Sequence, residues 1–212
     1  MMGLNRQKII IVNYGMGNLG SIHNMLRYIG YEAFISADTD EIMGADKLIL
    51  SGVGAFDGGM KNLIEGGFLF PLEKKVLYDK IPILGICLGM QLFSKRSEEG
   101  RLPGLGWLNA ETVRFSFGDN AGNLKIPHMG WNTVTIEKND PIFNRMPDDF
   151  RFYFVHSFHL LCANEEDVLG RTSHGYKFAS AIKKENIYGV QFHPEKSHRF
   201  GMQILRNFAE LI

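Results

Sequence analysis

The first half of the chain alternates short apolar runs with amphipathic segments. Each run is rich in β-branched residues, and the segment after it repeats its apolar residues every three to four positions. This alternation is typical of parallel strands joined by crossover helices. We expect strands at 8–13, 32–36, 47–50 and 81–86, helices at 21–28 and 87–95, and a helix with a loop at 58–75.

The pattern changes after residue 110 to strand-like runs separated by Gly, Asn, Asp and Pro. These predict strands at 112–117, 132–136, 151–157, 177–183 and 187–192, and an amphipathic helix follows at 197–211. The chain has no internal repeat, low-complexity tract or linker. We therefore expect one α/β domain over residues 1–212, with a mostly parallel central sheet flanked by helices and additional antiparallel strands in the C-terminal half.

Composition and charge exclude several classes of protein. The 212 residues contain 23 Lys+Arg and 23 Asp+Glu, so no net field attracts a nucleic acid or an anionic membrane. A hydrophobic content of 45% and a charged content of 22% are typical of a folded domain. The apolar run at 9–12 is too short for a signal peptide, and no stretch approaches the roughly 20 residues that span a bilayer. We expect a cytoplasmic protein.

The two cysteines, Cys87 and Cys162, stand at unrelated positions. They form neither a disulfide framework nor the paired spacing of a zinc site. His156 and His159 stand three apart in a predicted strand, and the chain contains no His-Glu-x-x-His. We expect no bound metal and no cofactor.

One of these cysteines has the sequence surroundings of a nucleophile. An apolar strand runs into Gly85-Ile86-Cys87-Leu88-Gly89 and then into a helix. Flanking glycines permit the tight turn from strand to helix that exposes a nucleophile, and the start of the helix favours the thiolate. A bare cysteine would more often be a small buried hydrophobic residue; the two glycines favour the catalytic interpretation.

A base and a group to orient it follow near the end of the chain, in His193-Pro194-Glu195. Residues two apart in an extended segment point to the same side, and Pro194 disfavours helix at His193. A nucleophilic cysteine needs this kind of pair. The alternative, an ordinary His and Glu at the end of a surface strand, is weakened by the cysteine elbow.

These features resemble the class I glutamine amidotransferases. Within that family, the chain looks most like the glutaminase subunits that supply ammonia for the synthesis of imidazole glycerol phosphate in histidine biosynthesis. The similarity spans the whole chain, and its most specific string is Pro-His-Met-Gly-Trp-Asn at 127–132. The other matching stretches lie at 13–18, 51–56, 85–91, 153–157 and 191–197.

The resemblance implies hydrolysis of L-glutamine to glutamate and ammonia. Cys87 would be the nucleophile, His193 the acid and base, and Glu195 the residue that orients His193. The backbone amides of Val53 and Leu88 would bind the oxyanion. Glutamine binding would fall to five positions of the family pattern: Gly54, Gln91, His156, Ser157 and Phe158.

The resemblance also implies a partner. The chain contains no Walker-type loop to activate an ammonia acceptor, so the acceptor site belongs to another polypeptide. In the family this is a (β/α)₈-barrel cyclase subunit of the HisF type, bound as a heterodimer. Its contacts would be Asn13, Gly17, Asn18, His128, Met129 and Trp131. Without the resemblance, Met129 and Trp131 would be expected in the core.

Three alternatives remain at this point. Ser51, Phe158 and the segment 196–201 resemble a paralogous branch that supplies ammonia for amidino or amino sugars of surface polysaccharides. The string Gly-x-Gly-x-x-Gly at 15–20, with Asp38 after the next strand, has the form of a dinucleotide-binding turn. A binding or regulatory protein without turnover is the third, although the Cys, His and Glu residues are all present.

Overall fold

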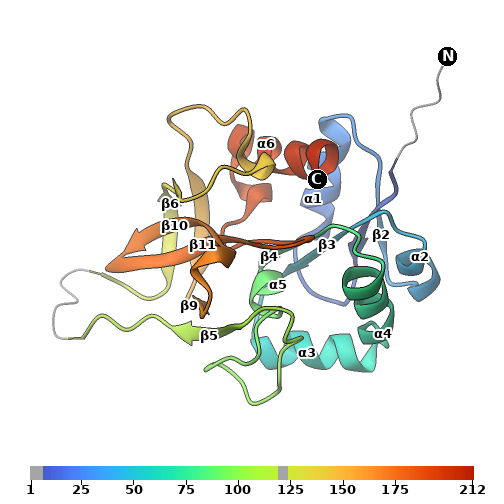
Figure 1. Ribbon diagram of the computed structural model, residues 1–212, viewed down its shortest axis with the longest axis horizontal. Coiled ribbons are helices and arrows are strands. Elements are labelled where there is room, and N and C mark those ends of the chain that lie inside the picture. Colours follow the sequence, from blue (N-terminus) through green and yellow to red (C-terminus); the bar gives the residue numbers. More distant parts are fainter. Residues whose placement is uncertain (1–6, 119–123) are drawn as a thin grey trace.

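Five parallel strands form the centre of the fold in the computed structural model, which describes residues 7–118 and 124–212 (Figure 1). Residues 1–6, which precede the apolar run that was compared with a signal peptide, lie outside the described residues. The order is β2-β1-β3-β4-β12, and each pairing is parallel. These strands are β1 (Ile9–Val12), β2 (Ala33–Ser36), β3 (Lys47–Gly52), β4 (Ile83–Cys87) and β12 (Ile187–Val190).

Antiparallel strands extend this sheet beyond β12. Strands β11, β10 and β7 follow in order, while β9 pairs with β11 and β5 pairs with β9. Strands β6 and β8 form a separate two-stranded antiparallel sheet. The expected α/β class, with antiparallel strands in the C-terminal half, is confirmed. The bounds are β5 (Ala110–Arg114), β6 (His128–Asn132), β7 (Thr135–Ile136), β8 (Phe152–His156), β9 (Phe158–Cys162), β10 (Val168–His174) and β11 (Tyr176–Lys184).

Helices cover both faces of the parallel strands (Figure 1). In β1, Ile9 and Ile11 pack with the helices α1 and α6, whereas Ile10 and Val12 pack with α2, α3 and α4. All four side chains are buried because a central parallel strand is covered on both faces. No helix among the described residues is long and apolar enough to cross a bilayer. The helices are α1 (Leu19–Tyr28), α2 (Thr39–Met43), α3 (Phe56–Glu65), α4 (Leu69–Glu73) and α6 (His198–Leu211).

A buried lysine ties the end of α6 to the sheet. The Lys47 side chain lies in β3, the residue is 1% exposed, and Nζ donates hydrogen bonds to the carbonyls of Phe208 (3.0 Å) and Ala209 (2.7 Å). Carbonyls in the last turn of a helix have no partner within the helix, and they carry the negative end of its dipole. Burial lowers the pKa of Lys47 to about 8.

Helix α2 and strands β9 and β10 were not predicted, and three predicted segments differ in extent. The predicted helix at 87–95 stops after one turn, α5 (Leu88–Gln91), because the backbone then turns back and Lys95 donates to the carbonyl of Ala110 (2.9 Å). The predicted strand at 132–136 is the end of β6 and the short β7, with a break between them. The segment 58–75 is divided by Gly66 and Gly67, and α4 runs on into a π-helical turn (Lys74–Tyr78).

Candidate active site

The candidate site lies where three neighbouring parallel strands end at the same edge of the sheet. Gly52, at the end of β3, pairs in register with Cys87 at the end of β4. Val190, at the end of β12, pairs with Ile86. The loop after Gly52, the cysteine and the segment 191–195 therefore meet at one edge, although they are far apart in the sequence.

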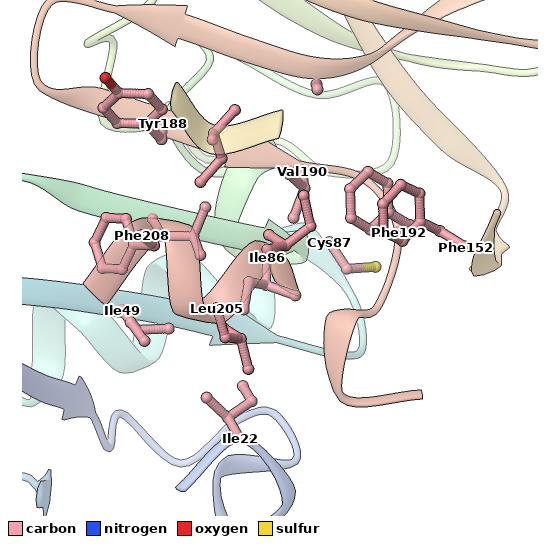
Figure 2. Close-up of a cluster of buried hydrophobic side chains, with 14 of the residues drawn as sticks. Ile22, Ile49, Ile86, Cys87, Phe152, Tyr188, Val190, Phe192, Leu205 and Phe208 are labelled. Atoms are coloured by element: carbon pink, nitrogen blue, oxygen red, sulfur yellow. The ribbon is translucent and has the colours of Figure 1, made fainter. Parts of the chain in front are cut away.

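Cys87 has the strained backbone of a nucleophile elbow, with φ 53° and ψ −112°. A non-glycine residue in this region costs roughly 1–3 kcal/mol, which the surrounding packing must offset. Both flanking glycines are required by close approaches: a Cβ at Gly85 would lie 2.8 Å from the Met90 nitrogen, and one at Gly89 would overlap the carbonyl oxygen of Leu50. Figure 2 shows the sulfur of Cys87 beside the buried side chains of Ile86 and Phe192, and the residue is 7% exposed.

His193 and Glu195 form a buried pair beside this elbow. Their side chains are 0% and 1% exposed, and Nδ1 of His193 lies 2.8 Å from Oε1 of Glu195. His193 is extended (φ −100°, ψ 98°), as the following Pro194 predicts. The extended geometry does not continue to Glu195, because Pro194–Lys196 form a 3₁₀ turn that brings the carboxylate back to the ring. Three hydrogen bonds fix the backbone of His193. Its N–H donates to the Tyr153 carbonyl (2.9 Å), and its carbonyl accepts from the Lys196 N–H (3.0 Å) and the Ser197 hydroxyl (2.6 Å).

The charges of the site favour a protonated His193. Burial lowers the pKa of its imidazole, but interactions with Cys87 and Glu195 outweigh burial and raise the pKa to about 10. A protonated imidazole beside Cys87 is a proton donor for a leaving group at this position. Nε2 of His193 is buried and has no hydrogen-bond partner among the described residues, so this nitrogen is available for proton transfer.

A cleft of about 530 Å³ opens onto Cys87. Eight of the residues predicted for catalysis, oxyanion binding or glutamine binding line it: Val53, Gly54, Cys87, Leu88, Gln91, His156, Ser157 and Phe158. Sequence reasoning missed four more lining residues, Glu99, Pro127, Val155 and Lys196. Lys196 directly follows the His-Pro-Glu string and could have been found there, whereas Glu99 lies in a polar segment without a motif. These two residues bring opposite charges to the cleft.

Two glutamines connect the wall of the cleft to the nucleophile. Nε2 of Gln91 donates to the Phe158 carbonyl (2.9 Å) and to Oε1 of Gln191 (3.0 Å). The amide of Gln191 in turn donates to the sulfur of Cys87 (3.6 Å). Gln191 is fully buried and was not predicted as a site residue, although it begins the string that contains His193. A donor to sulfur favours the thiolate over the thiol.

Two hydroxyl groups close to Cys87 are buried without a hydrogen-bond partner among the described residues, those of Tyr14 and Ser51. The Tyr14 hydroxyl lies against Gly52, where an added Cβ would overlap it. Burial, and secondarily the charge of Cys87, raise the pKa of Tyr14, so this hydroxyl stays protonated.

The residues predicted to face a partner divide into two groups. Met129 and Trp131 are 64% and 42% exposed, so they lie on the surface and not in the core that their residue types alone would suggest. Asn13 and Asn18 are also exposed and Gly17 is partly exposed. His128 is only 5% exposed, because side chains alternate along β6 and its ring points inward. The His128 side chain therefore does not lie on this surface.

The His128 ring belongs to a buried cluster of imidazoles. It lies 4.3 Å from the His174 ring and 5.1 Å from the His156 ring, measured between centroids. Burial, and then the His174 charge, lower the pKa of His128 to about 4. The pKa of His156 is also lowered, chiefly by burial. No group of three His, Cys, Asp or Glu side chains in the described part of the chain is arranged to hold a metal ion.

Acidification should destabilise the fold through these imidazoles. Between pH 6.5 and pH 4 the unfolded chain binds a proton at residue 128 that the folded chain does not bind, so the free energy of unfolding falls as pH falls. For His128 alone the loss is about 2 kcal/mol between pH 7 and pH 5, and His156 adds to it. Urea unfolding at the two pH values measures the change. In the variant His128→Asn, the free energy of unfolding should fall less between pH 7 and pH 5 than it does in the wild type. A wild-type protein that is as stable at pH 5 as at pH 7, or more stable, would contradict the prediction.

Comparisons with known proteins agree with this geometry. The family model of glutamine amidotransferase class-I matches residues 10–211. The chain is 52% identical over 202 residues to "Imidazole glycerol phosphate synthase subunit HisH 2" of Methanococcus maripaludis, covering 95% of this chain and 98% of that protein. It is 45% identical over 204 residues to the protein of the same name from Pseudomonas aeruginosa, covering 96% and 100%. The fold is similar to that of PurLQS from Thermotoga maritima, with a TM-score of 0.71, 18% identity and coverage of 96% and 97%.

Proposed function

This chain belongs to the glutamine amidotransferase class-I family, and we propose that it hydrolyses L-glutamine to glutamate and ammonia at Cys87 as the glutaminase subunit of an imidazole glycerol phosphate synthase. The observation that carries the chemistry is the meeting of the Cys87 elbow and the buried His193–Glu195 pair at one edge of the sheet. The family match over residues 10–211 supports a single domain over residues 1–212. The match includes the Gly-x-Gly-x-x-Gly string at 15–20, so this string belongs to the amidotransferase domain and we do not propose a dinucleotide-binding domain.

The proposed reaction has two halves. The Cys87 thiolate attacks the side-chain carbonyl carbon of glutamine, and the C–N bond breaks as the His193 imidazolium gives its proton to the departing ammonia. Neutral His193 then removes a proton from water, whose oxygen attacks the thioester and releases glutamate. The C–S bond breaks to regenerate the Cys87 thiolate, the proton taken from water stays on His193 and restores the imidazolium, and the new carboxyl group ionises to glutamate. Glu195 holds the ring in the required orientation throughout.

Backbone amides stabilise the oxyanion in this scheme. Leu88 is the first residue of α5, and its N–H has no acceptor within the helix. Val53 lies between Gly52 and Gly54, in the loop that begins beside Cys87. We propose these two N–H groups as the oxyanion donors, because donors fixed in advance cost no reorganisation during the reaction.

The remaining lining residues provide the means to bind an amino acid. Glu99 and Lys196 supply opposite charges, as a ligand with both an ammonium and a carboxylate group requires. Glu99 is held in place by the Phe56 N–H, which donates to Oε2 at 2.8 Å. We propose that Gly54, Gln91, His156, Ser157 and Phe158 form the walls that select the length and the amide group of glutamine.

The ammonia is delivered to a partner subunit in this proposal. Free ammonia becomes ammonium in neutral water, so a sheltered route to the acceptor preserves the nucleophile. We propose a (β/α)₈-barrel cyclase of the HisF type as the partner, docked over Asn13, Gly17, Asn18, Met129 and Trp131. The names of relatives at 52% and 45% identity support the histidine pathway. A cytoplasmic location is proposed with it, because a reducing compartment keeps the Cys87 thiol free.

The test is release of glutamate from glutamine by the purified chain, alone and with a histidine-pathway cyclase and its nucleotide substrate. Strong stimulation by the cyclase and nucleotide, absent from Cys87→Ala, is the expected result. Ser51 and Phe158 favour a second candidate, a paralogue that supplies ammonia for sugars of surface polysaccharides. Stimulation by a cyclase-like partner from that pathway, and none by the histidine cyclase, would establish the second candidate.

Truncation of Trp131 should weaken the complex. Its ring is 42% exposed and stacks on His198 with 5.6 Å between centroids, so it presents a rigid apolar surface to a partner. We expect Trp131→Ala to raise the Kd for the cyclase at least about tenfold. Titration calorimetry measures the change. Tyr78→Ala is the matched control, because this aromatic is 77% exposed but precedes β4, at the opposite edge of the strands; equal effects of both variants would contradict the proposed surface.

A further inference from the structure

A series of hydrogen bonds runs from the end of β6 to the wall of the glutamine cleft. Nδ2 of Asn132 lies 3.1 Å from Nε2 of His128, and Nδ1 of His128 lies 3.0 Å from Nε2 of His156. Nδ1 of His156 lies 2.8 Å from the Phe158 carbonyl oxygen. That oxygen also accepts from Gln91 (2.9 Å), so the series ends on a group that lines the cleft.

The end of the series at Phe158 sets the proton positions. A carbonyl oxygen only accepts, so Nδ1 of His156 carries the proton. In a neutral ring Nε2 of His156 is then an acceptor, and Nδ1 of His128 must donate to it. This leaves Nε2 of His128 as the acceptor for Asn132.

The other end of the series, at Asn132, requires the hydrogen bonds to be donated in the same direction, from Asn132 towards Phe158. Oδ1 of Asn132 accepts from the Thr133 N–H (2.8 Å), and Nδ2 donates to the Ser173 carbonyl (3.0 Å), so backbone groups fix the orientation of the amide. The amide therefore presents a donor to Nε2 of His128, which must be unprotonated. Both ends agree on a single arrangement in which both rings are neutral.

The surroundings favour neutral rings. His128 and His156 are 5% and 6% exposed, and the rings of Phe115, Phe154 and Phe178 pack around them. Burial lowers the pKa of both imidazoles. A proton on Nε2 of His128 would face the NH₂ group of Asn132 and break the series, so the network holds one tautomer of each ring.

We propose that Asn132 and His128 are positioning residues for glutamine binding, because their one-way series of hydrogen bonds fixes the His156 ring and the Phe158 carbonyl on the wall of the cleft. Neither side chain lines the cleft, so they act through His156. The inference deepens the proposed function and rests on it. Loss of the hydrogen bond between His128 and His156 lets the His156 ring and the Phe158 carbonyl move. It therefore weakens glutamine binding more than it slows the reaction at Cys87.

Two substitutions of His128 separate this role from simple packing. The amide of asparagine reaches the position of Nδ1, whereas the amide of glutamine reaches that of Nε2. His128→Asn therefore keeps the donor to His156, and His128→Gln loses it. With the cyclase partner present, we expect the KM for glutamine to stay within about twofold in the first variant and to rise about tenfold in the second, with kcat changing less. Equal KM values in the two variants would overturn the proposal.

Nitrogen NMR of the imidazoles provides a readout that does not depend on turnover. The wild-type complex should show His156 and His128 as single neutral tautomers protonated on Nδ1, and His128→Gln should shift the Nε2 resonance of His156, which loses its hydrogen-bond donor. A His156 protonated on Nε2 in the wild type would overturn the proposal even if the KM values followed the expected order. Wild-type protein that releases no Cys87-dependent glutamate would instead show that the proposed function has failed.

Discussion

Replacing Cys87 with alanine should lower glutamate release by at least about 10⁴-fold, to the level of uncatalysed hydrolysis in the assay. The thiolate forms the covalent bond to the substrate, and no other group of the cleft can take over that step. The variant should still fold, because alanine keeps the Cβ of a side chain that is 7% exposed and leaves the flanking glycines unchanged. Glutamate release at saturating glutamine, with the cyclase and its nucleotide substrate, is the measurement.

The second cysteine provides the control. Cys162 lies at the end of β9, and burial raises the pKa of its thiol to about 12, so it carries no thiolate near neutral pH. Cys162→Ala should keep the activity of the wild type. The proposed mechanism would be contradicted by a Cys87→Ala protein that has the same melting temperature as the wild type and still hydrolyses glutamine at a tenth of the wild-type rate.

Replacing His193 with asparagine should reduce kcat by about 10³- to 10⁴-fold. The asparagine amide can still reach Glu195 from the position of Nδ1, but no atom takes the place of Nε2, which moves the proton in both halves of the reaction. The positive charge that His193 places beside Cys87 is lost as well. Steady-state kinetics should show the loss mainly in kcat, with a smaller change in KM.

The double variant Cys87→Ala, His193→Asn tests whether the two residues act as one unit. Residues that share a step lose activity together, so the double variant should be no slower than Cys87→Ala alone. Activity of the double variant equal to that of His193→Asn, and above the Cys87→Ala background, would show that the activity left in His193→Asn does not depend on Cys87, and the proposed mechanism would be wrong.

The sequence predicted the parallel core well because β1, β3, β4 and β12 are covered on both faces. Such strands consist of continuous apolar residues, which stand out in any sequence. Strand β10 was missed because Arg171, Thr172 and Ser173 interrupt its apolar residues, although it forms a hairpin with the next strand, β11. Strand β9 was missed because it directly follows β8 and pairs with β5, which is far away in the chain. Helix α5 was predicted too long, since apolar residues continue to Phe93 while the backbone has already turned.

The site shows the same division between local and distant information. The spacing around Cys87 and between His193 and Glu195 is local, so it was readable from the sequence. The inward orientation of His128 depends on the register of β6 against β8, and the role of Glu99 depends on where α3 begins. Both are set by packing between segments that no short motif connects.

The place of β12 in the sheet has a consequence for how the protein is made. This strand is synthesised after every other strand, yet it lies between β4 and β11, in the middle of the sheet. Until residues 187–190 have been synthesised, β4 has no neighbouring strand on the side that β12 occupies. His193 and Glu195, which act with Cys87 in the proposed reaction, are synthesised later still. A chain that stops before residue 187 therefore has neither a closed sheet nor the His193–Glu195 pair, and it cannot hydrolyse glutamine by the proposed mechanism.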